Sequence, residues 1–143
     1  MVPNYSVGHL IRDAHRAMQR RLEEAIAPLG VSRGQWYFLR VLWEGDGLTQ
    51  RELSARVGMM EPTTVVALNG MEKTGLIRRE RSPEDRRKIH IYLTQKGSKL
   101  REDLLPLARE VNEKASVGIS EEDLDAFRRA ANAMIENLDS EDY

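Results

Sequence analysis

The residues best suited to binding chemistry are three consecutive cations, Arg86-Arg87-Lys88, at the end of a predicted turn. Alternating apolar and polar residues predict antiparallel strands over 76–81 and 88–93, which would place these cations at the tip of a β-hairpin. Turn-bounded apolar patterns predict two short helices just before it, over 49–58 and 62–74. Such a helix pair beside a basic ribbon could meet the major groove of DNA and the neighbouring minor groove together.

Catalytic and metal-binding patterns of comparable specificity do not occur in the sequence. Gly-x-Ser-x-Gly, P-loop and His-Glu-x-x-His motifs are absent. The chain contains no cysteine, which excludes disulfides, thiolate metal sites and thiol redox sensing within it. His9 and His15 are six residues apart, outside the i, i+4 spacing that places two ligands on one helical face. We therefore expect no enzyme, no cofactor and no metal site, with a metal-responsive regulator as a minor alternative.

Charge is distributed unevenly along the 143 residues, although the net charge is only −1. Residues 71–101 contain 10 Lys/Arg and 4 Asp/Glu, whereas residues 102–143 contain 4 and 12. Phosphate contact needs positive charge only at the contact face, so the basic block favours a nucleic-acid partner. Hydrophobic residues make up 41% of the chain, and the start lacks a basic segment followed by an apolar run. No apolar stretch reaches about 18 residues, so we expect a single cytoplasmic domain over 1–143.

Longer helices are predicted on either side of the basic unit. Apolar residues at three- and four-residue spacing predict helices over 5–28, 95–117 and 120–138, with Pro106 as a possible kink. Their apolar faces exceed what a winged helix of about 50 residues can cover, and such faces usually mark an oligomer interface. The predicted fold is therefore mainly α with a small β-ribbon. A winged helix-turn-helix over 32–93 is joined to a dimerisation part over 1–28 and 95–143.

Local sequence signals predict where the central helices begin and which of their residues are buried. Ser32 with Gln35, and Thr49 with Glu52, have the spacing of capping boxes. In the second helix of the predicted pair, we expect Val65, Leu68 and Met71 to be buried, and Glu61 to cap the helix start. Gly70 lies in the middle of this helix, where glycine costs about 1 kcal/mol relative to alanine. This cost indicates either a close approach of the backbone to a neighbour or simple tolerance.

Candidate DNA contacts come from the helix pair and the ribbon. They are Gln50, Arg51, Ser54, Thr63, Thr64, Ala67, Asn69, Arg78, Arg79, Asp85, Arg86, Arg87 and Lys88. A threonine can hydrogen-bond a base edge or pack its methyl group on thymine, although Thr63 and Thr64 could equally serve phosphates or the helix start. The N-terminus of the helix at Gln50 can receive a phosphate. Of Arg78 and Arg79, we expect one to touch the DNA backbone and the other to pair with an acidic residue of the same chain.

Several segments together carry a resemblance to the MarR family of winged-helix transcriptional regulators. They are residues 29–36, 48–54 and 71–79, and above all Asp85-Arg86-Arg87 followed by Leu93-Thr94-Gln95-Lys96-Gly97. The resemblance implies a homodimer that binds a palindromic promoter site, usually as a repressor released by a small, often aromatic or anionic, ligand. It also implies that Arg87 enters the minor groove while Asp85 holds it in place. The alternative for this turn is a solvated hairpin tip.

A ligand site would lie where the terminal helices meet the winged helix. Candidate lining residues are His15, Arg16, Trp36, Arg40 and Trp43. A cation beside aromatic walls suits an aromatic carboxylate, a phenol or an acyl thioester. The competing interpretation is core packing for both tryptophans and solvation for both arginines. For the whole protein, the competing function is a winged helix that binds another protein. The sequence does not identify the operator, the regulated genes or the effector.

Overall fold

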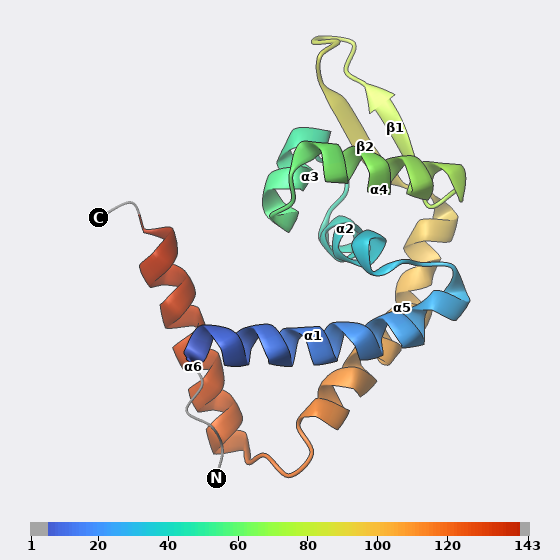
Figure 1. The fold of residues 1–143 in the computed structure, drawn as a ribbon. Coiled ribbons are helices and arrows are strands. Elements are labelled where there is room, and N and C mark those ends of the chain that lie inside the picture. The colour runs from blue at the N-terminus through green and yellow to red at the C-terminus, as the bar shows by residue number, and fades with distance from the viewer. Residues whose placement is uncertain (1–5, 141–143) are drawn as a thin grey trace.

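The computed structural model describes residues 6–140, which contain six α-helices, one short 3-10 helix and a two-stranded antiparallel sheet (Figure 1). In chain order the elements are α1 (Val7–Ile26), η1 (Ala27–Leu29), α2 (Arg33–Glu44), α3 (Gln50–Val57), α4 (Glu61–Lys73), β1 (Ile77–Arg81), β2 (Ile89–Leu93), α5 (Gln95–Ala115) and α6 (Glu121–Asp139). The predicted fold class is confirmed. Residue 5, the expected start of the first helix, lies outside the described residues.

Side-chain hydroxyls begin most of the helices, as the sequence predicts. Ser32 and Gln35 form both halves of a capping box at the start of α2. At α3 only half of the expected box forms. The Glu52 backbone N–H donates to the Thr49 hydroxyl over 3.1 Å, and that hydroxyl donates to the Glu52 carboxylate over 2.9 Å. The Glu52 side chain thus binds the capping side chain instead of the Thr49 backbone, and the helix still begins where predicted.

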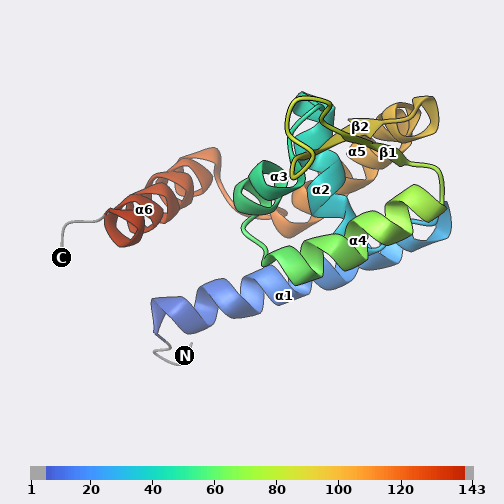
Figure 2. The ribbon, with the colours of Figure 1, turned by 90° about the horizontal axis from the view of Figure 1, so that it is seen from above.

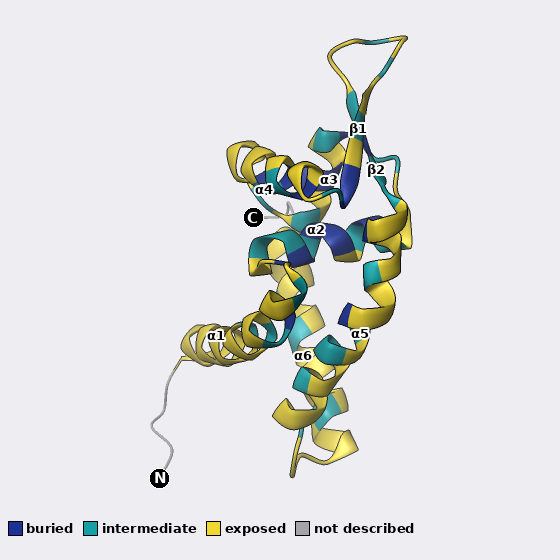
Figure 3. Cartoon of the chain, turned by 90° about the vertical axis from the view of Figure 1, so that its right-hand side faces the viewer, coloured by how far each residue is buried: buried dark blue, intermediate teal, exposed yellow. Residues whose placement is uncertain are grey.

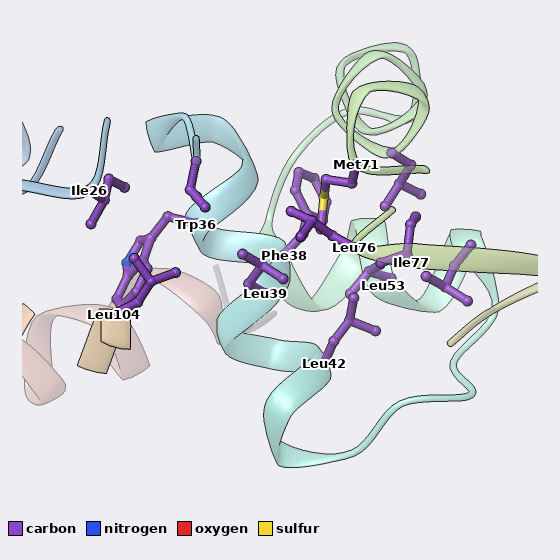
Figure 4. Close-up of a cluster of buried hydrophobic side chains, with 13 residues drawn as sticks. Ile26, Trp36, Phe38, Leu39, Leu42, Leu53, Met71, Leu76, Ile77 and Leu104 are labelled. Carbon is purple, nitrogen blue, oxygen red and sulfur yellow. The ribbon is translucent and has the colours of Figure 1, made fainter. Parts of the chain in front are cut away.

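The core is built around α2 (Figure 4). Phe38, which the sequence analysis did not single out, is fully buried on this helix. Figure 4 shows the Phe38 side chain between α2 and residues of α3, α4 and β1, near Met71 and Leu76. Two residues earlier on α2, Trp36 lies close to Leu104 of α5. Helix α2 therefore connects the winged-helix part to the outer helices.

The buried face of α4 differs from the expected one. Thr64, Leu68 and Met71 are fully buried, whereas Val65 is 36% exposed. Positions 64, 68 and 71 repeat at the four- and three-residue spacing of one helical face, and Val65 is turned about 100° from that face. The prediction that Val65 is buried was wrong, because a hydroxyl group occupies the inward position.

Strand β2 lies between two partners. It pairs with β1 in an antiparallel register that places Ile77 opposite Leu93. On its other edge, the Ile91 N–H donates to the Leu48 carbonyl over 2.8 Å and the Gly47 N–H donates to the Ile91 carbonyl over 2.7 Å. The loop before α3 therefore acts as a short third strand, and it anchors the hairpin to the start of α3.

The junction between β2 and α5 explains the Leu-Thr-x-x-Gly pattern of the sequence. The Gly97 N–H donates to the Thr94 hydroxyl over 3.1 Å, and the same hydroxyl donates to the Gly75 carbonyl. A β-carbon on Gly97 would lie 2.1 Å from the Leu76 carbonyl oxygen. The first turn of α5 packs so closely on the chain entering β1 that only glycine fits there.

The outer helices extend away from the winged-helix part. Helix α6 stands clear of the other elements (Figure 2) and contributes no buried residue within the described part of the chain. Figure 3 shows α6 and the N-terminal half of α1 as mostly exposed. Large apolar side chains lie on these surfaces, including Leu10 at 48% exposure and Phe127 at 61%. Over residues 6–140, no helix has the length and apolar character needed to cross a membrane.

Candidate nucleic-acid interface

The hairpin tip presents one arginine in a fixed orientation. The Arg87 side chain is 91% exposed, and its Nε and Nη2 atoms donate to the two carboxylate oxygens of Asp85 over 3.0 and 3.2 Å. The Arg87 backbone N–H also donates to Asp85 over 3.1 Å. These bonds, the side-chain pair first, hold the pKa of Asp85 below its ordinary value. Asp85 therefore stays ionised at neutral pH, and the guanidinium group of Arg87 is directed outward.

Arg81, which the sequence analysis overlooked, supports the same turn from β1. Its Nη1 atom donates to the Arg86 carbonyl over 2.6 Å. The Ser82 and Lys88 backbones close the hairpin with a 2.9 Å hydrogen bond. Arg86 and Lys88 are exposed beside Arg87, as the charge pattern predicts. The only sequence signal for Arg81 was its membership of the basic block.

The face of α4 that points away from the core carries a mixture of side chains. Pro62, Val66, Asn69 and Lys73 follow one another at helical spacing, and all are exposed. Val66, at 73% exposure, and Lys73 are additions to the predicted set. Thr63 and Asn69 were predicted and are exposed, whereas Ala67 is half-buried against the core.

Two of the predicted contact residues, Ser54 and Thr64, lie inside the helix pair. Their exposed fractions are 3% and 0%, and their hydroxyl oxygens are 2.8 Å apart. The Ser54 hydroxyl donates to the Met59 carbonyl over 2.7 Å, so in the pair it accepts the Thr64 proton, which the Met60 carbonyl at 3.1 Å shares. The structure corrects the expectation that these hydroxyls face DNA. They join α3 to α4 and satisfy each other's polar atoms in the interior.

The start of α4 also differs from expectation. Met60 is the capping residue and makes no side-chain capping bond, while Glu61 is the first residue of the helix. Glu61 therefore does not cap α4, although a carboxylate in the first turn does stabilise the helix dipole. Gly70 faces α2, where a β-carbon would lie 3.0 Å from the Gln35 amide nitrogen. The approach is close, but the neighbouring atom is the end of a flexible side chain, so the contact alone does not require glycine.

A groove of about 600 Å³ joins the three elements of the candidate interface. Gln50 and Arg51 line it from α3, Glu61 from α4, and Arg87 and Lys88 from the hairpin. The structure thus brings the predicted helix start and the predicted cations to one surface. The lining also includes the carboxylates of Glu52 and Asp85. Asp85 is paired with Arg87, so Arg51, Lys88 and the amide groups of the helix start are the groups that suit a phosphate.

The two arginines of β1 have different surroundings, as the sequence analysis expected in part. Arg78 is exposed, pairs with Glu80 and lies 4.6 Å from the centre of the Tyr92 ring. Arg79 is half-buried and donates from Nη1 to the Asn69 side-chain oxygen over 2.7 Å. The acidic pairing expected for one of the two belongs to Arg78. Arg79 instead connects the sheet to α4.

A cavity of about 410 Å³ lies between α1, α2 and α5. It is lined by three of the five predicted ligand residues, His15, Trp36 and Arg40. Arg16 and Trp43 do not line it. The Trp43 indole N–H donates to the Gly97 carbonyl over 2.9 Å, and its ring packs edge-on against Trp36 with centroids 5.7 Å apart, which is a role in the core.

Four polar lining residues of this cavity were missed, namely Gln19, Tyr37, Arg109 and Asn112. Gln19 donates to the Tyr37 hydroxyl over 2.6 Å, and Arg109 brings a second cation from α5. The helical pattern of α5 places Arg109 near its apolar stripe, but only the packing of α5 on α1 shows that it reaches the cavity.

Two of the three histidines, His9 and His90, take part in hydrogen bonds. His90 donates from Nδ1 to the Gly47 carbonyl over 2.8 Å, and His9 lies 2.9 Å from the Ser6 hydroxyl. In the described residues, no group of three or more His, Asp or Glu side chains has the geometry to hold a metal ion.

Comparison with known proteins gives a consistent result. A family model described as "MarR family" matches residues 29–88. The organic hydroperoxide resistance transcriptional regulator of Bacillus subtilis (strain 168) is 29% identical over 132 residues, covering 90% of this chain and 86% of the relative. A MarR transcriptional regulator from Methanosarcina mazei Go1 is 30% identical with a TM-score of 0.85, covering 92% of this chain and 94% of that one. The S. aureus MepR–DNA complex shares the fold, with a TM-score of 0.86 at 24% identity, covering 94% and 99%.

Proposed function

Because the chain belongs to the MarR family of winged-helix, DNA-binding transcriptional regulators, we propose that it is a homodimeric repressor released from a palindromic operator by a small ligand. The observation that carries this proposal is the shared surface formed by the Arg87 tip, the start of α3 and the exposed face of α4. On this surface α4 enters the major groove. Arg87 enters the adjacent minor groove, whose negative potential attracts a planar cation. The same function places the protein in the cytoplasm.

The remaining contacts divide by chemistry. Gln50 and Arg51 at the start of α3, with Arg86 and Lys88 at the hairpin, bind phosphates and fix the register on the duplex. Thr63, Val66 and Asn69 on α4 face base edges. The exposed methyl groups of Val66 suit the methyl group of a thymine. The fold of the MepR–DNA complex, which the chain shares, is compatible with this placement.

Dimerisation follows from the uncovered apolar surface. Leu10 and Ile11 of α1, together with Phe127, Ile135 and Leu138 of the α6 region, are between 46% and 70% exposed. A second copy is the occupant that we propose, because a two-fold dimer also places two α4 helices on successive turns of one duplex face. For such a dimer the half-sites lie about 34 Å apart.

The effector site is the cavity between α1, α2 and α5. Trp36 and Tyr37 supply aromatic walls, and Arg40 and Arg109 supply positive charge, so an aromatic carboxylate or a phenol fits its chemistry. The absence of cysteine means that thiol oxidation is not the signal. Phenolic acids and their thioesters should raise the unfolding temperature if they occupy this cavity.

The deciding experiment measures the binding of purified protein to a duplex selected from a random pool. Arg87→Ala should weaken binding by about 1–3 kcal/mol and should also reduce the dependence on salt. Arg101→Ala on the exposed surface of α5 removes the same charge and is the matched control. Equal affinity of the Arg87 variant and the control would remove the wing from the interface. A wild-type protein that selects no sequence and captures a protein partner would instead favour the competing protein-binding function.

A further inference from the structure

Arg79 and Asn69 form a contact between the sheet and the outer face of α4. The Arg79 Nη1 atom donates to the Asn69 side-chain oxygen over 2.7 Å. Asn69 is exposed on the stripe of α4 that also carries Val66 and Lys73, while Arg79 is half-buried behind it on β1. The contact therefore joins an interior cation to a residue of the candidate DNA-reading face.

The guanidinium group of Arg79 is poorly satisfied. Its Nε and Nη2 atoms are buried and have no hydrogen-bond partner, and no carboxylate lies within ion-pair distance among residues 6–140. A buried cation without a counter-charge destabilises a folded protein. Its only side-chain hydrogen bond within the described residues is the one to Asn69. Arg79 in this position therefore lowers the stability of the fold, which indicates that it serves a function other than stabilisation.

The contact also fixes the orientation of the Asn69 amide. A guanidinium group has only donors, so the asparagine atom that faces it must be the oxygen. The Nδ2 amide group then points the other way, and no hydrogen bond within residues 6–140 uses it. Asn69 consequently offers donors to an outside partner, while its acceptor is directed toward β1.

We infer that Arg79 is a positioning residue that makes Asn69 a donor-only reader of one base pair in the major groove. This inference rests on the proposed function, in which α4 lies in that groove. The partner is a base-edge acceptor, namely guanine O6 or N7, thymine O4 or adenine N7, and cytosine, which presents only an amino group there, is disfavoured. A free asparagine would fit adenine with its oxygen and nitrogen together, but Arg79 holds the oxygen out of reach. Arg79 itself does not touch DNA, because its remaining nitrogens are buried.

The test uses the full chain and three variants, Asn69→Ala, Arg79→Met and the pair combined. Each is compared with wild type in selection from a random duplex pool and in binding to the selected site with every single-base change. Arg101→Met on α5 controls for the loss of one charge. Thermal unfolding of the free proteins is recorded in parallel.

We expect Asn69→Ala and Arg79→Met to relax discrimination at the same single base pair of each half-site by roughly three- to tenfold, the loss of about one hydrogen bond. The combined variant should relax it no further. Arg79→Met should unfold at the same temperature as wild type or higher, since a buried unpaired charge is removed. A purely structural tether would instead lower the unfolding temperature and leave base preference intact.

Three results would overturn the inference. One is an unchanged preference in Asn69→Ala, an exposed substitution that carries little risk to folding. Another is a uniform loss of affinity in Arg79→Met at every base, which would make Arg79 a phosphate contact. A third is selection of cytosine at the base position that faces Asn69, because its major-groove edge presents only a donor. Failure of the wild-type protein to select any sequence would refute the proposed function itself, and that outcome is distinguishable from the other three.

Discussion

Gly97 is the position where a single methyl group should be most damaging. An added β-carbon would lie 2.1 Å from the Leu76 carbonyl oxygen and 3.2 Å from a methyl group of Leu93. The first of these distances is about 1 Å shorter than a tolerable contact, and the atom being met is backbone. The first turn of α5 must therefore move away from the chain that enters β1.

The magnitude follows from the contacts that would separate. Such a movement stretches the bond from the Thr94 N–H to the Leu76 carbonyl at 3.0 Å, the Thr94 hydroxyl bond to Gly75, and the Trp43 bond to the Gly97 carbonyl at 2.9 Å. Each is worth about 1 kcal/mol, and overpacking adds about 1–3 kcal/mol. Gly97→Ala should thus lower the free energy of unfolding by about 4–6 kcal/mol, a large share of the stability of a small domain.

Urea denaturation followed by circular dichroism measures this difference. Gly34→Ala is the matched control, because Gly34 also lies in the first turn of a helix and its β-carbon would come no closer than 3.9 Å to a neighbouring atom. Replacing a helical glycine with alanine at an open position should stabilise by about 0.5–1 kcal/mol. If Gly97→Ala were as stable as wild type, the account of this junction would be refuted.

Three other perturbations test separate parts of the molecule. Thr64→Val removes one hydroxyl of the buried pair while Ser54 keeps its bond to the Met59 carbonyl. The free energy of unfolding measured in urea should therefore fall by about 1 kcal/mol. An unchanged free energy would contradict the conclusion that this hydroxyl pair joins α3 to α4. Because the bonds from Arg87 lower the pKa of Asp85, their stabilising contribution is present at neutral pH and is lost as the pH falls through that lowered value. The carboxyl ¹³C titration of Asp85 should therefore have a lower midpoint in wild type than in Arg87→Ala, and equal midpoints would refute the pairing. Phe127→Ser should shift the protein from dimer to monomer in sedimentation at micromolar concentration, while Glu122→Ser on the same helix should not; an intact dimer in the Phe127 variant would exclude this face of α6.

The sequence alone was sufficient for the elements that local signals define. Ser32 begins its helix as predicted, and the helices predicted from residues 95 and 120 begin just after Thr94 and Ser120, because a capping hydroxyl acts within three residues of itself. The Asp85–Arg87 pair also spans only two residues, and its geometry is that implied by the family resemblance. Interactions between residues two or three positions apart can be predicted from the sequence alone.

Errors occurred where the outcome depended on packing between elements. Val65 and Thr64 are neighbours, and residue type alone favours burying the valine. The structure buries the threonine, because Ser54 and the Met59–Met60 turn supply partners for its hydroxyl. Only the approach of α3 to α4 reveals those partners.

The residues that line the cavity could not be predicted from the sequence for the same reason. Trp36 and Trp43 look equivalent in the sequence, but one lines the cavity and the other is held by the Gly97 carbonyl, 54 residues away. Arg109 and the other lining residues of α5 lie far along the chain from His15 and Arg40, and no local pattern connects the two groups. Residues brought together by distant helices require the structure.

The loop before α3 pairs with β2 as a short third strand, and this pairing limits where residues can be inserted into the chain. Since Gly47 and Leu48 are in register with Ile91, an insertion between Gly45 and Leu48 would slip the pairing and tilt hairpin and helix together. The tip between Ser82 and Lys88 has no such constraint from a neighbouring element, so extra residues there would lengthen the hairpin without disturbing its base. Changes in length should therefore be tolerated at the tip and should destabilise the protein in the segment at 45–49.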